Sequence, residues 1–170
     1  METDLGKIRR LARKKEDENL KFRSFLKSCN GEKIDKIVHR LVAEVSAQID
    51  CSKCMNCCKE FLPSLDQADI ERMARGLEIS PEQFKQQYLV QEKDSPAHTF
   101  KTKPCPILRD NRCSLEAYQP GDCKTYPHLD KSGFITRLTA VISNCSVCPI
   151  AFNVYEELKR EVWHRRGQKR

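Results

Sequence analysis

The chain has 170 residues, of which 39% are hydrophobic, and it carries a formal net charge of +7. This length suffices for one domain, but the apolar fraction is slightly below that of an ordinary globular domain, so we expect a modest core. The charged N-terminus lacks the apolar stretch of a secretory signal, and no segment approaches the roughly 20 apolar residues of a membrane span, so we expect a cytoplasmic protein without a membrane segment.

The N-terminal part is predicted to be helical and to pack on the rest of the protein as a segment of residues 1–50. Residues 5–28 have the composition of a polar helix, and Asn30-Gly31 is a typical helix end. Residues 33–49 repeat apolar side chains at intervals of three and four, which predicts an amphipathic helix leading into Cys51.

Two further helices are predicted downstream. Asp66 is placed to cap a helix that continues to about Leu77. Ser80-Pro81-Glu82-Gln83 combines a capping residue, a proline at the first helical position and a glutamine at the third, which predicts a helix to about Leu89. Residues 92–104 are predicted to form a loop.

The remaining elements are short. The pair Asp110-Asn111 predicts a hairpin turn within an otherwise irregular segment over residues 105–128. Residues 134–142 alternate weakly between apolar and polar positions, which indicates one strand or the arm of a hairpin. Pro149 is expected to open a closing helix over residues 149–165, whose end Trp163 anchors.

The predicted fold class is therefore mainly α with short irregular β hairpins, as a small cysteine-rich single domain organised by metal. We expect the metal-binding domain to cover residues 51–150. A C-terminal helix and a basic tail are expected over residues 151–170.

Cysteine is the residue type that indicates function. The chain has ten cysteines, and four of them lie in the run Cys51-Ser52-Lys53-Cys54-Met55-Asn56-Cys57-Cys58. Thiols at C-x2-C spacing wrap around one metal centre, whereas a disulfide framework fits a reducing cytosol and a vicinal cysteine pair poorly. We therefore expect a metal protein.

The vicinal pair Cys57-Cys58 restricts how the thiols are used. Adjacent side chains in an extended or turning backbone diverge, so we expect either two neighbouring metal sites or one cluster with one thiol of the pair left over. Asn56 tolerates the left-handed conformation that such a tight loop requires.

The identity of the metal is open at this point. Cys51-x2-Cys54-x2-Cys57 matches the first three ligands of a ferredoxin-type [4Fe-4S] loop, whose remaining ligand is remote and precedes proline, as in Cys105-Pro106 and Cys148-Pro149. The same spacing builds zinc knuckles, so zinc is the alternative to an iron–sulfur cluster. The candidate ligands are Cys51, Cys54, Cys57, Cys58, Cys105, Cys113, Cys123, Cys145 and Cys148.

Two residues outside this set are interpreted without a ligand role. Cys29 stands alone before Asn30-Gly31 and is expected to be a half-buried structural thiol. His128 follows Cys123 by five residues, close enough to join a site, but a surface histidine is the favoured interpretation.

These motifs together resemble the CxxCxxCC cysteine-cluster family, a YkgJ-type zinc- or iron-chelating domain, over residues 50–150. In that family the cluster is followed by C-P-x-L, C-x-x-Y/E and R-P-x-x-C-R-x-Y/F-P segments. Here they read Cys105-Pro106-Ile107-Leu108, Cys113-Ser114-Leu115-Glu116 and Gln119-Pro120-Gly121-Asp122-Cys123-Lys124-Thr125-Tyr126-Pro127, with Gln119 and Lys124 in place of arginines. The resemblance implies metal chelation, and a relative, the flagellin lysine N-methylase, suggests cluster-dependent methyl transfer to protein lysines.

Three functions are consistent with the sequence. The first is a cytosolic protein that holds an iron–sulfur cluster and has a redox, accessory or unassigned enzymatic role. The second is a zinc-stabilised interaction module whose basic ends, at residues 7–15 and 165–170, engage an acidic partner. The third is a protein lysine N-methylase-like enzyme, although no nucleotide-binding loop is seen. Because Glu16, Asp17 and Glu18 interrupt the first basic run, a nucleic-acid partner is not expected.

Overall fold

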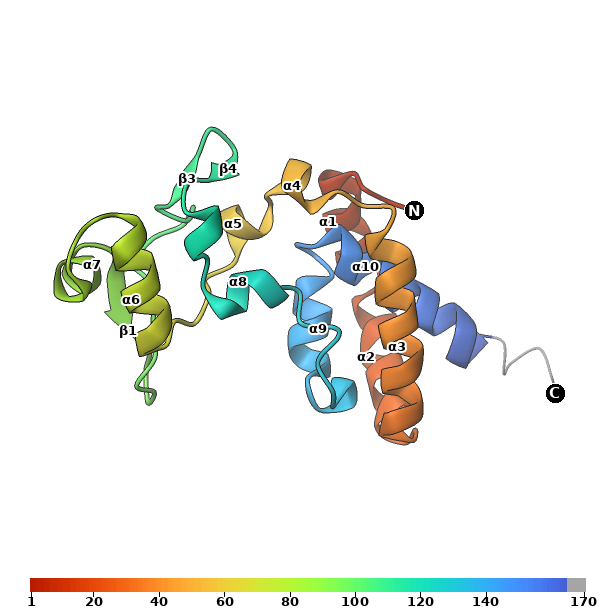
Figure 1. Cartoon of the computed structure of the whole chain (residues 1–170). Helices are drawn as coiled ribbons and strands as arrows, with labels where there is room; N and C mark the ends of the chain where they lie inside the picture. Colours follow the sequence, from red (N-terminus) through yellow and green to blue (C-terminus); the bar gives the residue numbers. More distant parts are fainter. Residues whose placement is uncertain (165–170) are drawn as a thin grey trace. The chain divides into compact units, whose positions relative to one another are not determined.

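The computed structural model describes residues 1–164, which divide into two compact units (Figure 1). The first, which we call the helical unit, consists of Met1–Asp50 and the chain from Pro127 onward. The second, the cysteine unit, consists of Cys51–Tyr126. Helices dominate the described residues, with two short antiparallel strand pairs in the cysteine unit, so the predicted fold class of a mainly α protein with short β hairpins is confirmed.

The helical unit consists of α-helices joined by short turns. Its described elements are α1 (Leu5–Lys14), α2 (Glu16–Lys27), α3 (Gly31–Ser46), the 3-10 turn η2 (Phe134–Thr136), α9 (Leu138–Asn144), α10 (Pro149–Lys159) and the π-helical turn η3 (Arg160–His164). The basic tail at residues 165–170 lies outside the described residues, as does the last residue of the predicted closing helix.

The prediction of one helix over residues 5–28 is wrong, because the structure has two. Lys15 leaves the helical conformation with φ −97° and ψ 14°, which ends α1 and lets α2 begin at Glu16. The first turn of α2 is acidic, and carboxylates there stabilise the positive end of the helix dipole. The same charges that break the basic run therefore favour a new helix start.

Asn30 has the opposite role from the one predicted. Its side chain accepts the Lys33 N–H at 3.0 Å, so it caps the start of α3 instead of ending α2. The amphipathic pattern of α3 is confirmed, although the helix ends at Ser46, three residues before the predicted end. Its buried residues are Ile34, Val38, Leu41 and Val45.

The closing helix α10 supplies the centre of the helical unit's core and packs against α3 and α1. Ile150, Val154 and Leu158 are buried on it. Trp163 stacks on Phe22 with ring centroids 5.3 Å apart, so it anchors the end of the helix as predicted.

The predicted strand over residues 134–142 is wrong, because this segment forms η2 and α9. Phe134, Leu138 and Val141 are its buried side chains, and their spacing of four and three residues is helical. Asp35 on α3 holds the start of the segment by accepting the backbone N–H groups of Gly133 at 2.8 Å and Phe134 at 2.9 Å.

A buried ion network stabilises the helical unit. Lys159 is fully buried, and its ammonium group lies 2.7 Å from Glu156 and 3.0 Å from Glu18. Lys15 donates a second hydrogen bond to Glu156. Burial opposes the charge of Glu156, but the hydrogen bonds from Lys15 and Lys159 outweigh it and lower the pKa of that carboxyl below its usual 4.5.

Among the described residues, no single helix has the length and hydrophobicity needed to cross a membrane. The helical segments Leu138–Asn144 and Pro149–His164 pass the test only when they are taken together, and they are bent by 120° at the break between them.

The cysteine unit has shorter elements. They are α4 (Cys51–Cys54), α5 (Cys57–Glu60), α6 (Gln67–Gly76), α7 (Pro81–Tyr88), β1 (Leu89–Gln91), β2 (His98–Phe100), β3 (Leu108–Arg109), β4 (Arg112–Cys113), the 3-10 turn η1 (Glu116–Tyr118) and α8 (Gly121–Thr125). Asp66 caps α6, and Ser80 with Gln83 forms the capping box of α7, so both predicted helix starts are confirmed.

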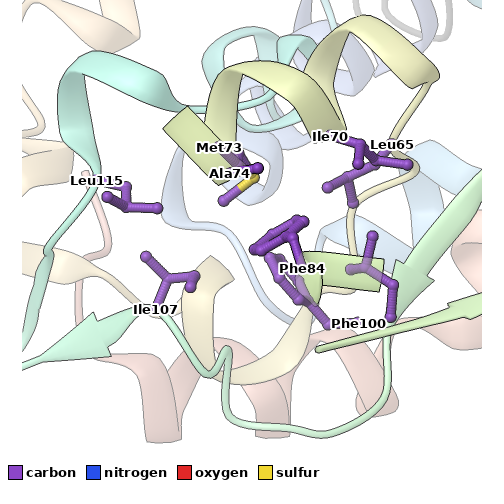
Figure 2. Close-up of a cluster of buried hydrophobic side chains, with 9 residues drawn as sticks. Leu65, Ile70, Met73, Ala74, Phe84, Phe100, Ile107 and Leu115 are labelled. Atoms are coloured by element: carbon purple, nitrogen blue, oxygen red, sulfur yellow. The ribbon is translucent and has the colours of Figure 1, made fainter. Parts of the chain in front are cut away.

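One hydrophobic cluster holds these elements together (Figure 2). Ile70, Met73 and Ala74 project from α6 towards Phe84 on α7. The other members of the cluster are Leu65, Leu89, Phe100, Ile107 and Leu115. The half-buried thiols of Cys105 and Cys113 pack against this cluster, so the core fixes part of the cysteine framework directly.

The two strand pairs give one confirmation and one correction. The predicted hairpin is confirmed, because β3 and β4 flank Asp110 and Asn111, which have φ of 48° and 57° as a two-residue turn of this kind requires. The predicted loop over residues 92–104 instead contains β2, which pairs with β1 in the register Leu89↔Phe100. Burial of Phe100 fixes that strand.

The buried network predicts a pH-dependent loss of stability. We expect Glu156→Gln to lower the free energy of unfolding at pH 7 by about 1.5–3 kcal/mol, the usual worth of hydrogen bonds to a charged group. Because the folded pKa is depressed, this stabilisation is present above the unfolded pKa and is lost as the pH falls through the folded pKa. Urea unfolding should therefore show wild type and variant converging below pH 4.5.

Glu157→Gln is the matched control, because it removes the neighbouring exposed pair with Arg160. We expect it to change the free energy of unfolding by less than about 1 kcal/mol. A Glu156→Gln difference that stays constant down to about pH 3 would contradict the role of the Glu156 carboxylate.

Candidate metal centre

The opening cysteine run folds as two single helical turns. Cys51 and Cys54 bound α4, and Cys57 and Cys58 begin α5. The left-handed residue between them is Met55, with φ 45°, whereas Asn56 is right-handed at φ −68°, so the prediction for Asn56 is wrong. Asn56 is instead the buried residue that precedes α5.

The vicinal thiols lie in the first turn of α5. Successive side chains of a helix point about 100° apart, so the divergence of the two thiols stays a prediction. Interaction with Cys58 lowers the pKa of Cys57 to about 7, and interaction with Cys57 raises the pKa of Cys58.

Two remote cysteines reach this cluster through backbone pairing. The N–H of Cys105 donates to the carbonyl of Cys58 at 2.7 Å, which ties the segment before Pro106 to α5. Cys113 lies on β4 opposite Leu108 on β3, so the hairpin returns the chain to the same region. The pairing with Leu108 also explains why a two-residue turn is needed at this point.

Cys123 comes from a fourth segment, the short helix α8. Its N–H donates to Pro120 O at 3.1 Å, and the neighbouring Asp122 carboxylate accepts the Ser64 N–H at 3.0 Å. This contact ties α8 to the chain that follows α5.

The four segments surround one cavity with a volume of about 550 Å³. Its thiol lining consists of Cys51, Cys57, Cys58, Cys105, Cys113 and Cys123. The apolar wall includes Phe61 and Tyr126, whose ring centroids are 4.7 Å apart. Lys53 and Arg112 contribute cationic groups to the lining, and Glu116 contributes a carboxylate.

The cavity thiols influence one another's ionisation. Burial raises the pKa of Cys105, and burial together with the nearby Cys105, Cys57 and Cys113 raises the pKa of Cys123 to about 12. Thiolates held this close together repel each other, and a bound cation removes that repulsion. A metal would therefore stabilise the deprotonated form of these side chains.

The donor set fits a thiolate-bound metal, because cysteine sulfur is the ligand preferred by zinc and by iron–sulfur clusters. Among the described residues, no three His, Cys, Asp or Glu side chains lie at the spacing of ligands to one ion. The thiols thus share a cavity, and they must move closer together to bind one metal.

The remaining candidate ligands lie elsewhere. Cys54 is half-buried and does not belong to the cavity lining that the structure describes. Cys145 and Cys148 are buried in the helical unit, where burial raises the pKa of Cys145 and its thiol donates to Val141 O at 3.2 Å. The half-buried Cys29 thiol donates to Phe25 O at 3.5 Å, which agrees with its predicted structural role.

Several lining residues were not predicted from the sequence. Phe61 and Arg112 carry no motif of their own, whereas Glu116 and Gln119 lie in family segments but were not named as site residues. All four meet only because the hairpin and α8 fold back onto α5. The proximity of each residue to a cysteine in the sequence is the one signal available. His128 lies in the helical unit and adopts a left-handed φ of 61°.

Separate segments of the cysteine unit gather cysteines on one cavity, which is the arrangement expected of a cysteine-rich metal-chelating domain. The sequence model of the CxxCxxCC family, described as a "putative zinc- or iron-chelating domain", matches residues 50–149. The chain belongs to this family, as its motifs indicated. Neither the curated proteins nor the solved structures contain a match to the chain. Family membership supports metal binding without distinguishing zinc from iron.

The geometry predicts which thiols matter for metal content. We expect Cys113→Ser and Cys123→Ser to lose most of the bound metal, because each removes a donor that only its own segment brings to the cavity. Metal analysis after gel filtration measures the loss. Cys29→Ser is the matched control and should keep the wild-type content, since that thiol lies in the helical unit. Full metal content in Cys123→Ser would remove this residue from the ligand set.

Proposed function

We propose that the cysteine unit holds an iron–sulfur cluster, of the [4Fe-4S] type, on thiols of its cavity. The protein then serves as a cytosolic redox or accessory protein. The observation that carries this proposal is the gathering of six thiols on one cavity of about 550 Å³. When bound, such a cluster supplies one-electron chemistry at a potential set by charge, hydrogen bonding and solvent exposure.

The size of the cavity is compatible with a cluster. A single ion is no larger than a water molecule, whereas a cavity of about 550 Å³ also has room for a group of several irons and sulfides. A cluster with several irons and sulfides fills more of that space and accepts thiolates from positions that are farther apart.

The chain's own residues contribute a suitable environment. Phe61 and Tyr126 limit access of water from their side of the cavity, and Lys53 and Arg112 place positive charge on a lining that would hold anionic thiolates. Cys105 precedes Pro106, which agrees with the remote ligand of ferredoxin-type loops.

A zinc-stabilised interaction module is the second candidate. The family description favours it equally, because it names zinc beside iron. A structural zinc site takes four ligands in a closed tetrahedron, so two of the six cavity thiols would stay protonated. Small buried thiols are tolerated as apolar side chains, which makes this arrangement physically acceptable.

The deciding experiment is a metal and acid-labile sulfide analysis of protein purified without oxygen, with its visible spectrum. We expect brown protein with iron and sulfide in near-equal amounts, because each thiolate-bound iron of a cluster is accompanied by a sulfide. Cys123→Ser should lose the colour, and Cys29→Ser should keep it. Colourless wild-type protein with one or two zinc ions would overturn the cluster and establish the zinc module.

A further inference from the structure

The segment that carries Cys123 depends on contacts from outside itself. α8 has only five residues, and a helix of that length is unstable alone. Its N-cap residue is Pro120, which provides no capping side chain. The first N–H groups of any helix need partners from elsewhere, so α8 requires an acceptor from another element.

That acceptor is Asp69 on α6. Asp69 is buried, with 7% of its surface exposed, and its Oδ1 accepts the Gly121 N–H at 3.1 Å. The carboxylate is paired with the Arg72 guanidinium one helical turn further along α6. A buried carboxylate therefore caps the first residue of α8 from a different helix.

Arg72 binds the residue that precedes Pro120. Its Nε and Nη2 donate to the Gln119 carbonyl at 3.3 Å and 3.1 Å. The Gln119 carbonyl and the Gly121 N–H are thus both fixed by one ion pair. Cys123 follows two residues after the second of these groups.

The Asp69–Arg72 ion pair is itself held in place by the contacts of α6. Asp66 caps α6 by accepting the Asp69 N–H at 2.7 Å, so the backbone of Asp69 is fixed. Ile70, Met73 and Ala74 bury a neighbouring face of α6 in the hydrophobic cluster (Figure 2). The ion pair of Asp69 and Arg72, which we call the clamp, therefore connects the hydrophobic cluster to the segment that carries Cys123.

We propose that Asp69 and Arg72 are positioning residues of the metal centre, acting on the backbone that carries Cys123. The inference rests on the proposed role of Cys123 as a ligand. Neither side chain is assigned a bond to the metal. Loss of the clamp frees α8, which lets the Cys123 thiolate leave the metal more readily. Changes to groups that orient metal ligands typically cost about 10–100-fold in metal affinity.

The test compares metal release from full-length protein as purified. Excess chelator is added, and release of the metal found in wild type is followed over time, together with alkylation of Cys123 by iodoacetamide. We expect Asp69→Ala to release metal about 10–100-fold faster and to expose Cys123 to alkylation. Arg72→Ala should act in the same direction.

Gly121 offers a matched pair that leaves Asp69 intact. Gly121→Pro removes the N–H that Asp69 accepts and places the ring Cδ against the Asp69 carboxylate, so the contact is broken while both clamp side chains stay in the chain. Pro120 is already extended at ψ 156°, the first helical position favours proline, and a Cβ at residue 121 meets no atom within 4 Å. Gly121→Ala keeps the N–H. We expect rapid release from the proline variant and wild-type release from the alanine variant.

Asp35→Ala separates positioning from general destabilisation. Asp35 also caps two loop N–H groups, but in the helical unit, so its loss should lower thermal stability without accelerating release. Equal release from Gly121→Pro and Gly121→Ala would overturn the clamp, as would equal acceleration in Asp35→Ala and Asp69→Ala. Zinc in wild-type protein would sink only the cluster proposal, because the release comparison then proceeds with zinc. Wild-type protein without any metal would overturn both.

Discussion

Several thiolates cannot gather at one cavity unless positive charge compensates them, and this electrostatic constraint governs the cysteine unit. Burial and neighbouring thiols raise the pKa of Cys123 to about 12, so this side chain prefers to stay protonated in the presence of the others. Ionising the thiols together therefore requires a cation, while the rest of the unit fixes where the thiols lie. The Cys105 to Cys58 backbone bond, the β3–β4 hairpin and the Asp69–Arg72 pair each hold one segment in place.

The helical unit meets the corresponding problem with its own side chains. Lys159 is fully buried, but Glu156 and Glu18 surround its ammonium group, so the charge is balanced within the chain. Aromatic packing of Phe22 against Tyr155 and Trp163 completes a core built from helices alone. In the cysteine unit, Lys53 and Arg112 provide cations on the cavity lining, and a bound metal adds the compensation at the thiolates themselves.

Features encoded by neighbouring residues could be predicted from the sequence. The caps at Asp66 and Ser80 and the Asp110-Asn111 turn depend on a few adjacent side chains, and all three are present. Errors arose where distant contacts decide the outcome. Residues 134–142 alternate only weakly, and it is their helical burial on the core, with the Asp35 cap on Gly133 and Phe134, that selects a helix.

The residues that line the cavity could likewise be predicted only in part from the sequence. The sequence indicated a metal centre and its thiols, because C-x2-C spacing has a local geometric meaning. It could not indicate that Arg112 and Phe61 share the lining, since only tertiary folding brings β4 beside the turn that follows α5. Nor could spacing locate the left-handed residue at Met55, because Asn tolerates that conformation better than Met and tertiary context overrode the preference.

The identity of the metal depends less on the number of cavity thiols than on how the thiols are distributed over the chain segments. A surplus cysteine is a small apolar side chain when protonated, so six thiols are compatible with a four-ligand zinc site. Either ligand requires the thiols to move, because among the described residues no three donors lie at the spacing of ligands to one ion. A cluster would accept thiolates from more widely separated segments than one ion would, which is the physical reason for proposing it. The hydrophobic cluster and the Asp69–Arg72 pair limit how far those segments can move.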